Sequence, residues 1–216
     1  MSANFLDLPR ELRDLVYELC LLHPVPIVPW FQQELTSGLL RANKTAHREA
    51  SPLFYSQNRF DFTWTGPEEI ASFLRTIGRN NDYIQHVCVD FPHFHYREPG
   101  DVTLSDGGIS IFESIQSSCA NLSTLTAFAY STYSMELRLE EPDNPEIVTE
   151  VLMLVDTRFR AISSLKKIIV CVYDDDPSSS FIREMKNRGW TINETEYGEE
   201  WDTDRYDDHL GDNDYD

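Results

Sequence analysis

The sequence predicts a mixed α/β fold, with helices at the N-terminus packed on a small irregular layer of helix-strand units whose strands are mainly parallel. Two observations lead to this prediction. Near the start of the chain, leucines recur every three or four residues, which is the period of an amphipathic helix. Further along, a short apolar pattern recurs three times, each time after a helical stretch, as expected of strands in βα units.

The first element is a helix that begins near Leu8. Pro9 suits its first turn, where a missing N–H costs no hydrogen bond, and Asp7 can cap the turn. Helical spacing gathers one apolar stripe from Leu8, Leu12, Leu15, Val16, Leu19 and Leu22. Such a stripe fits a docking helix and a core helix equally well.

The next elements follow from proline, period and turn signals. The prolines within residues 24–29 predict an extended stretch, because each disfavours helix at the residue before it. A second helix is expected at residues 39–49. Residues 58–64 alternate like a strand that places on one face Phe60, Phe62 and Trp64. A helix then opens at Gly66-Pro67 and ends near Gly78.

The recurring pattern, apolar-x-x-apolar-x-apolar, spans residues 84–89, 122–127 and 165–170. It resembles a degenerate leucine-rich-repeat unit. Its spacing exceeds the roughly 20 to 29 residues of standard leucine-rich repeats. We therefore expect an irregular α/β layer with parallel strands rather than a true solenoid. A last helix at residues 178–188 stops at Gly189 and leads into a short strand at residues 190–192.

Three runs near the N-terminus carry a family resemblance. Residues 8–17 read LPRELRDLVY, residues 39–43 read LLRAN and residues 53–60 read LFYSQNRF. Together they resemble the divergent F-box-like domains of filamentous fungi, over roughly residues 1–62. The resemblance implies docking on the Skp-family adaptor of a cullin-RING ubiquitin ligase, with the rest of the chain holding a substrate. The implied adaptor-binding residues are Leu8, Pro9, Leu12, Leu15, Val16 and Leu19.

Charge divides the chain into unequal parts. The formal charge is −19, and lysines and arginines less acids give −1 for residues 1–62 (6 − 7), −8 for 63–193 (11 − 19) and −10 for 194–216 (1 − 11). We expect an F-box-like helical segment at 1–62, a leucine-rich-repeat-like α/β region at 63–193 and a flexible acidic tail at 194–216. An acidic surface repels phosphates, which disfavours nucleic acid and favours a basic protein partner.

Aromatic side chains mark a candidate partner surface. Two long connections are expected, at residues 92–108 and 131–145, and connections of this length are often functional. The acidic tail also contains aromatics, as do acidic segments that fold onto a basic partner. The candidates are Phe94, Tyr96, Tyr130, Tyr133, Trp201 and Tyr206. The alternatives are that the loop rings only anchor their loops and that the tail has no partner.

No catalytic signature occurs in the chain, neither a nucleophile elbow nor a phosphate-binding or dinucleotide-binding glycine motif. His93, His95 and Asp90 are a possible metal set, but a short H-x-H occurs by chance, so we expect neither metal nor cofactor. The four separated cysteines are expected to be buried thiols. Without a membrane-spanning run or a secretory signal, the expected location is the cytoplasm or the nucleus.

These observations predict a non-catalytic interaction protein. The first hypothesis is a substrate adaptor of a cullin-RING ubiquitin ligase that docks through its first helix. The second is a scaffold or chaperone that holds a basic protein on its acidic surface and tail.

Overall fold

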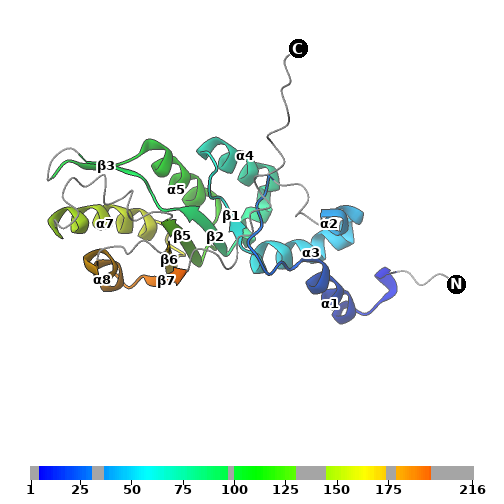
Figure 1. Ribbon diagram of the computed structural model, residues 1–216. Coiled ribbons are helices and arrows are strands. Elements are labelled where there is room, and N and C mark those ends of the chain that lie inside the picture. Colours follow the sequence, from blue (N-terminus) through cyan, green and yellow to red (C-terminus); the bar gives the residue numbers. More distant parts are fainter. Residues whose placement is uncertain (1–4, 31–36, 97–99, 130–144, 174–178, 196–216) are drawn as a thin grey trace, which may run out of the picture.

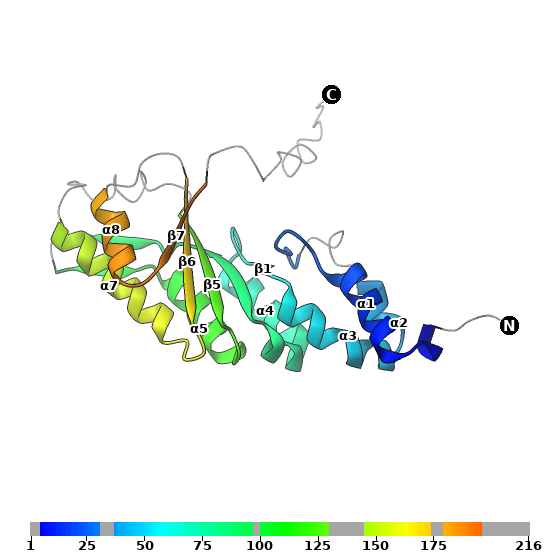
Figure 2. The ribbon, with the colours of Figure 1, turned by 90° about the horizontal axis from the view of Figure 1, so that it is seen from below.

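The computed structural model describes residues 5–30, 37–96, 100–129, 145–173 and 179–195. Helices α1 to α3 lie at one end of an elongated molecule, and a parallel sheet with its own helices fills the rest (Figure 1 and Figure 2). The predicted mixed α/β class with mainly parallel strands is therefore confirmed.

The N-terminal helical segment begins with a 3-10 turn, η1 (Phe5–Asp7), followed by α1 (Arg10–Leu21), α2 (Ser37–Ala42) and α3 (Lys44–Gln57). The prediction of a single helix at residues 39–49 is wrong, because parts of two helices, α2 and α3, occupy this stretch. They are separated at Asn43, whose backbone is extended and whose side chain accepts a hydrogen bond from the Ala46 amide at 2.9 Å. A helix-capping residue thus interrupts an otherwise helical sequence.

The main sheet contains β1 (Phe60–Asp61), β2 (His86–Asp90), β5 (Thr124–Ala129), β6 (Lys167–Tyr173) and β7 (Thr191–Thr195). The strands are parallel and lie in the order β1-β2-β5-β6-β7. The recurring sequence pattern forms β2, β5 and β6, in register: His86 pairs with Thr124, and Thr124 with Lys167. Equivalent residues of the three units thus stand side by side.

Side chains before the strands tie consecutive units together. Asn121 donates from Nδ2 to the carbonyl oxygen of Asp82 at 2.8 Å, and Ser164 donates from Oγ to that of Leu122 at 2.8 Å. Asn121 and Ser164 each precede the first apolar residue of their unit. These bonds reach back to the preceding unit and help to fix the register.

Between the strands lie α4 (Pro67–Ile77), η2 (Gly78–Tyr83), α5 (Asp106–Ser118), α7 (Pro145–Arg160) and α8 (Ser179–Asn187). Gly78, with φ of +57°, ends α4 as predicted. The crossover helices share one hydrophobic core with alternate strand residues such as Val87, Leu125 and Val170. The intervening residues Cys88, Phe128 and Cys171 form a separate small cluster. Hence the helices cover one face of the sheet.

The predicted strand at residues 58–64 is shorter in the structure, because it ends at Asp61 and the chain then turns. The turn is held by Asp61, whose Oδ1 accepts hydrogen bonds from the amide and the hydroxyl of Thr63. Trp64 follows with φ of +56° and is exposed, and its amide donates to Asp90 Oδ2 at 2.8 Å. Trp64 therefore does not share a strand face with Phe60 and Phe62, both of which are buried.

The connection predicted at residues 92–108 contains an antiparallel hairpin formed by β3 (Phe94–Tyr96) and β4 (Val102–Leu104). Val102 and Leu104 are buried, and β4 contacts α7. The second predicted connection, at residues 131–145, lies outside the described residues except at Pro145, where α7 begins.

The two predicted segment boundaries, after residue 62 and after residue 193, lie at the outer strands of the main sheet. β1 lies before residue 62, so the N-terminal segment contributes the first strand of the main sheet. β7 includes Glu194 and Thr195, the first two residues of the predicted tail, and residues 196–216 lie outside the described part. Cys88, Cys119 and Cys171 are buried thiols as predicted, but Cys20 is exposed on α1. None of the described helices is long and apolar enough to cross a bilayer.

Candidate docking surface on the first helix

The apolar stripe of α1 lies on the surface. Its leucines are exposed to increasing degrees along the chain: Leu8, just before the helix, by 36%, and within the helix Leu12 by 47%, Leu15 by 54% and Leu19 by 85%. We call these four residues the leucine stripe. Beside it, Pro9 is exposed and Val16 is partly exposed. Of the six residues implied by the family resemblance, Leu12, Leu15, Val16 and Leu19 thus lie on one accessible side of α1. Leu8 and Pro9 are exposed just before the helix begins.

The opposite side of α1 joins it to the protein. Tyr17 and Leu21 are buried, and the ring of Phe5 meets that of Tyr17 edge-on with centroids 5.6 Å apart. This side packs against α3. The leucine stripe is therefore not the side that holds α1 in place, and the core-helix interpretation of the stripe is wrong.

A charged network fixes α1 on α3. Arg13 donates from Nε and Nη2 to the two carboxylate oxygens of Glu49, at 2.9 and 2.7 Å, and the Tyr17 hydroxyl donates to Glu49 Oε2 at 3.1 Å. The hydrogen bonds from Arg13, opposed in part by desolvation, lower the pKa of Glu49 to about 2. Arg13 Nη1 also donates to the Leu8 carbonyl at 2.6 Å, so the same side chain orders the start of the stripe.

Sequence reasoning did not single out Arg13 and Glu49 as positioning residues. A signal was present, since Arg13 and Tyr17 are four residues apart and share a helix side that excludes the leucine stripe. Their partner Glu49 is distant in the sequence, and only the packing of α1 on α3 brings it close. No pattern within residues 8–21 could have identified it.

The aromatic partner candidates are not brought together. Phe94 is 2% exposed, so its assignment to a partner surface is wrong: it lies in the main core. Tyr96 ends β3 opposite Val102, and its side chain is outside the described part of the structure. The remaining candidates lie outside the described residues: Tyr130, Tyr133, Trp201 and Tyr206.

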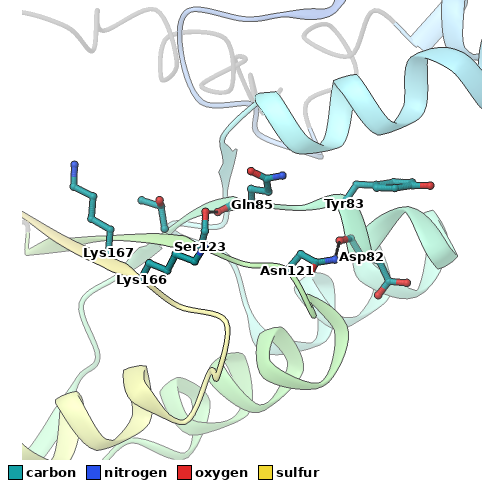
Figure 3. A pocket seen from close by; sticks show the side chains of 8 residues that line it. Asp82, Tyr83, Gln85, Asn121, Ser123, Lys166 and Lys167 are labelled. Atoms are coloured by element: carbon teal, nitrogen blue, oxygen red, sulfur yellow. Dashed lines mark hydrogen bonds between the residues drawn. The ribbon is translucent and has the colours of Figure 1, made fainter.

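A shallow hollow of about 440 Å³ lies where β2, β5 and β6 begin (Figure 3). Its lining is polar and of mixed charge, consisting of Asp82, Tyr83, Gln85, Asn121, Ser123, Thr124, Lys166 and Lys167. The Ser123 hydroxyl donates to the Gln85 carbonyl at 3.2 Å, so it serves the structure of the sheet. The hollow contains no histidine or cysteine.

Over the described residues, no three histidine, cysteine, aspartate or glutamate side chains gather as ligands of a metal ion would. The leucine stripe is thus the surface with the clearest chemistry, which is apolar contact. Comparisons with family models, with curated proteins and with solved structures found no match. The stripe is therefore interpreted from its own geometry and from the motif that contains it.

Proposed function

We propose that this protein is a non-catalytic substrate adaptor of a cullin-RING ubiquitin ligase, and that the leucine stripe of α1 binds the Skp-family adaptor. The observation that supports this most directly is the exposure of the stripe. A row of leucines facing water is unfavourable for a monomer, and such patches typically mark protein-protein contacts. Here Leu12 and Leu15 are each about half exposed, and Leu19 is almost fully exposed.

The way α1 is held also suits docking. Because Arg13, Tyr17 and Leu21 hold the other side of the helix, a partner can cover the stripe without opening the core. In the complex, one side of α1 packs on α3 and the leucine stripe packs on the partner. A helix that is already formed and fixed loses little conformational entropy on binding, which favours affinity.

The substrate would be held at the other end of the molecule. The helices α1 to α3 lie at one end of the molecule, and the helices α7 and α8 lie at the other end in both views (Figure 1 and Figure 2). By sequence, residues 63–216 carry 18 of the 19 excess negative charges (8 + 10), 15 of them in residues outside the described part, and this acidity favours a basic protein as the substrate. This separation would let one chain hold the ligase and the substrate simultaneously.

The test is a binding assay between the purified full chain and the Skp-family adaptor. Leu15→Asp should abolish binding and leave the fold intact, since Leu15 makes no contribution to the core. Met153→Asp is a matched control, because Met153 is similarly exposed, 51% against 54%, but lies on α7. Circular dichroism checks that both variants are folded. A folded wild-type chain that does not bind the adaptor would refute the proposal.

A scaffold or chaperone for a basic protein is the second candidate, and the charge of −10 over residues 194–216 favours it. Its binding should weaken steeply as salt is raised from 0.05 to about 0.5 M, because screening acts on charge contacts. It should also tolerate Leu15→Asp. The adaptor complex, held mainly by apolar contact, should weaken much less over this range of salt and should not tolerate Leu15→Asp.

A further inference from the structure

The spacing of the leucine stripe is more specific than general amphipathicity. Its members are separated by four, three and four residues. Within α1, Leu12, Leu15 and Leu19 follow the a, d and a pattern of a coiled-coil seam, and Leu8 lies just before the helix at the same end of the row. Tyr17 then falls at position f, directly opposite the seam, where it is buried against the protein. Such a seam is shaped to receive the side chains of one further helix.

The two edges of the stripe differ in charge. In this heptad, Glu11 and Glu18 occupy the g positions, seven residues apart on one edge. Both are exposed, and neither makes an ion pair with any described residue. On the other edge the e position within α1 is Val16, and Pro9 precedes the helix as its N-cap; both are uncharged. One edge is therefore acidic and the other apolar.

The α1 helix of a second copy of this chain would not complement the acidic and apolar edges of the leucine stripe. An antiparallel pair of α1 helices would place the g positions together, bringing the Glu11 and Glu18 carboxylates of both copies against one another. A parallel pair would place each glutamate beside an e position, where Pro9 and Val16 offer no cation. Like charges at these positions oppose pairing. The charge pattern therefore favours a partner of different sequence.

We propose that the leucine stripe receives a single amphipathic helix of its partner, with leucine-like side chains on the seam and lysine or arginine along the edge facing Glu11 and Glu18. This inference rests on the proposed docking function and specifies its chemistry. The partner helix need be only about two heptads long, since the 12 residues of α1 span about 18 Å at 1.5 Å per residue.

The first test uses two synthetic three-heptad peptides with leucine at a and d. One has lysine at e and g and the other glutamate, so that each repels its own copies and stays monomeric. Anisotropy titrations with the full chain should show the lysine peptide bound about five-fold or more tightly than the glutamate peptide at low salt. Leu15→Asp should abolish this binding.

Two double variants with the same change in net charge separate a local effect of Glu11 and Glu18 from attraction to the overall charge. Glu11→Lys/Glu18→Lys should weaken binding of the lysine peptide about five-fold and strengthen binding of the glutamate peptide. Glu68→Lys/Glu113→Lys changes the net charge equally at two exposed sites on α4 and α5, and should leave the preference almost unchanged. Equal effects of both pairs would overturn the inference, because attraction to the overall charge would then suffice.

The same variants separate this inference from the proposed function. In the first outcome, the Skp-family adaptor binds wild type, loses affinity with Glu11→Lys/Glu18→Lys and keeps it with Glu68→Lys/Glu113→Lys. That result supports the ligase proposal and the basic-helix inference together. If it binds wild type and the charge-swapped chain equally, the inference is wrong and the ligase proposal stands. If the adaptor does not bind while the lysine peptide shows the expected pattern, the ligase proposal is wrong and the stripe serves another basic helix.

Discussion

At the scale of single residues, Asn58 connects the end of α1 to the end of α3. Its side-chain amide donates to the carbonyl oxygens of Leu21 and Phe54, at 2.8 and 2.9 Å, and its side-chain oxygen accepts from the His23 amide at 2.8 Å. The residue is 1% exposed, so water cannot replace these bonds. The asparagine of the LFYSQNRF run therefore fixes the exit of α1 beside the end of α3.

Replacing Asn58 by leucine should lower the free energy of unfolding by about 2 to 4 kcal/mol, because the Leu21 carbonyl would lose its buried side-chain donor and the His23 amide would lose the Asn58 oxygen as acceptor. Urea denaturation measures this change. Asn187→Leu, at an exposed position on α8, is the control and should change stability by less than about 0.5 kcal/mol. Equal effects of the two substitutions would show that the Asn58 bonds contribute little.

At the scale of elements, α1 is an attached unit rather than a central one. Its side toward the protein meets α3, whereas α3 also contacts η2 of the α/β layer. The principal charged attachment is Glu49, which bonds Arg13 and Tyr17. The stability of α1 is therefore expected to depend on this contact more than the sheet does.

Glu49→Ala should loosen α1 without unfolding the sheet, since Arg13 and the Tyr17 hydroxyl would lose their acceptor. Amide hydrogen exchange, read by mass spectrometry, should become faster in α1 while β2, β5 and β6 keep their protection. Glu18→Ala removes an exposed carboxylate without an ion pair and is the control. Uniformly faster exchange throughout the chain would contradict this view of α1.

At the scale of the whole molecule, His86 and Glu49 make the folded state less stable as the pH falls. Burial, with Arg59 and Lys167 nearby, lowers the pKa of His86 from 6.5 to about 4, and its Nε2 lies 2.8 Å from the Thr126 hydroxyl. Between these values the unfolded chain binds a proton at His86 and the folded chain does not. Acidification from about pH 6.5 to 4 therefore favours unfolding.

Glu49 affects stability at lower pH, between its ordinary pKa of 4.5 and its folded-state pKa of about 2, and here too acidification favours unfolding. Its stabilising contribution is complete above pH 4.5 and is lost as the pH falls through about 2. Burial raises the pKa of Asp90, which acts in the opposite direction and partly offsets the loss.

Urea unfolding from pH 7 to 3 should therefore show a decline in the free energy of unfolding that begins near pH 6.5. His86→Asn should flatten the decline between pH 6.5 and 4, whereas Glu49→Gln should flatten it below pH 4.5. If the free energy of unfolding of wild type and His86→Asn fell in parallel between pH 6.5 and 4, His86 would be ruled out as the cause of the decline in this range.

The fold was largely predictable because its elements are coded locally. Three strands follow one short apolar pattern, and Gly78 and Gly189 end helices at positions of positive φ, where glycine is favoured. The predictions failed where side-chain hydrogen bonds override periodicity. Asn43 divides a predicted helix and Asp61 turns the chain before Trp64, and neither effect appears in a hydrophobic pattern.

The sequence by itself determined the α/β class, the strands of the recurring units and the identity of the leucine stripe, because residue periods and turn residues encode these features over a few neighbours. It did not determine which way the stripe faces, since a helix with leucines on one side can bury or expose them. Tertiary structure decided this, because Glu49, distant in the chain, binds Arg13 and Tyr17 and turns the leucines toward water.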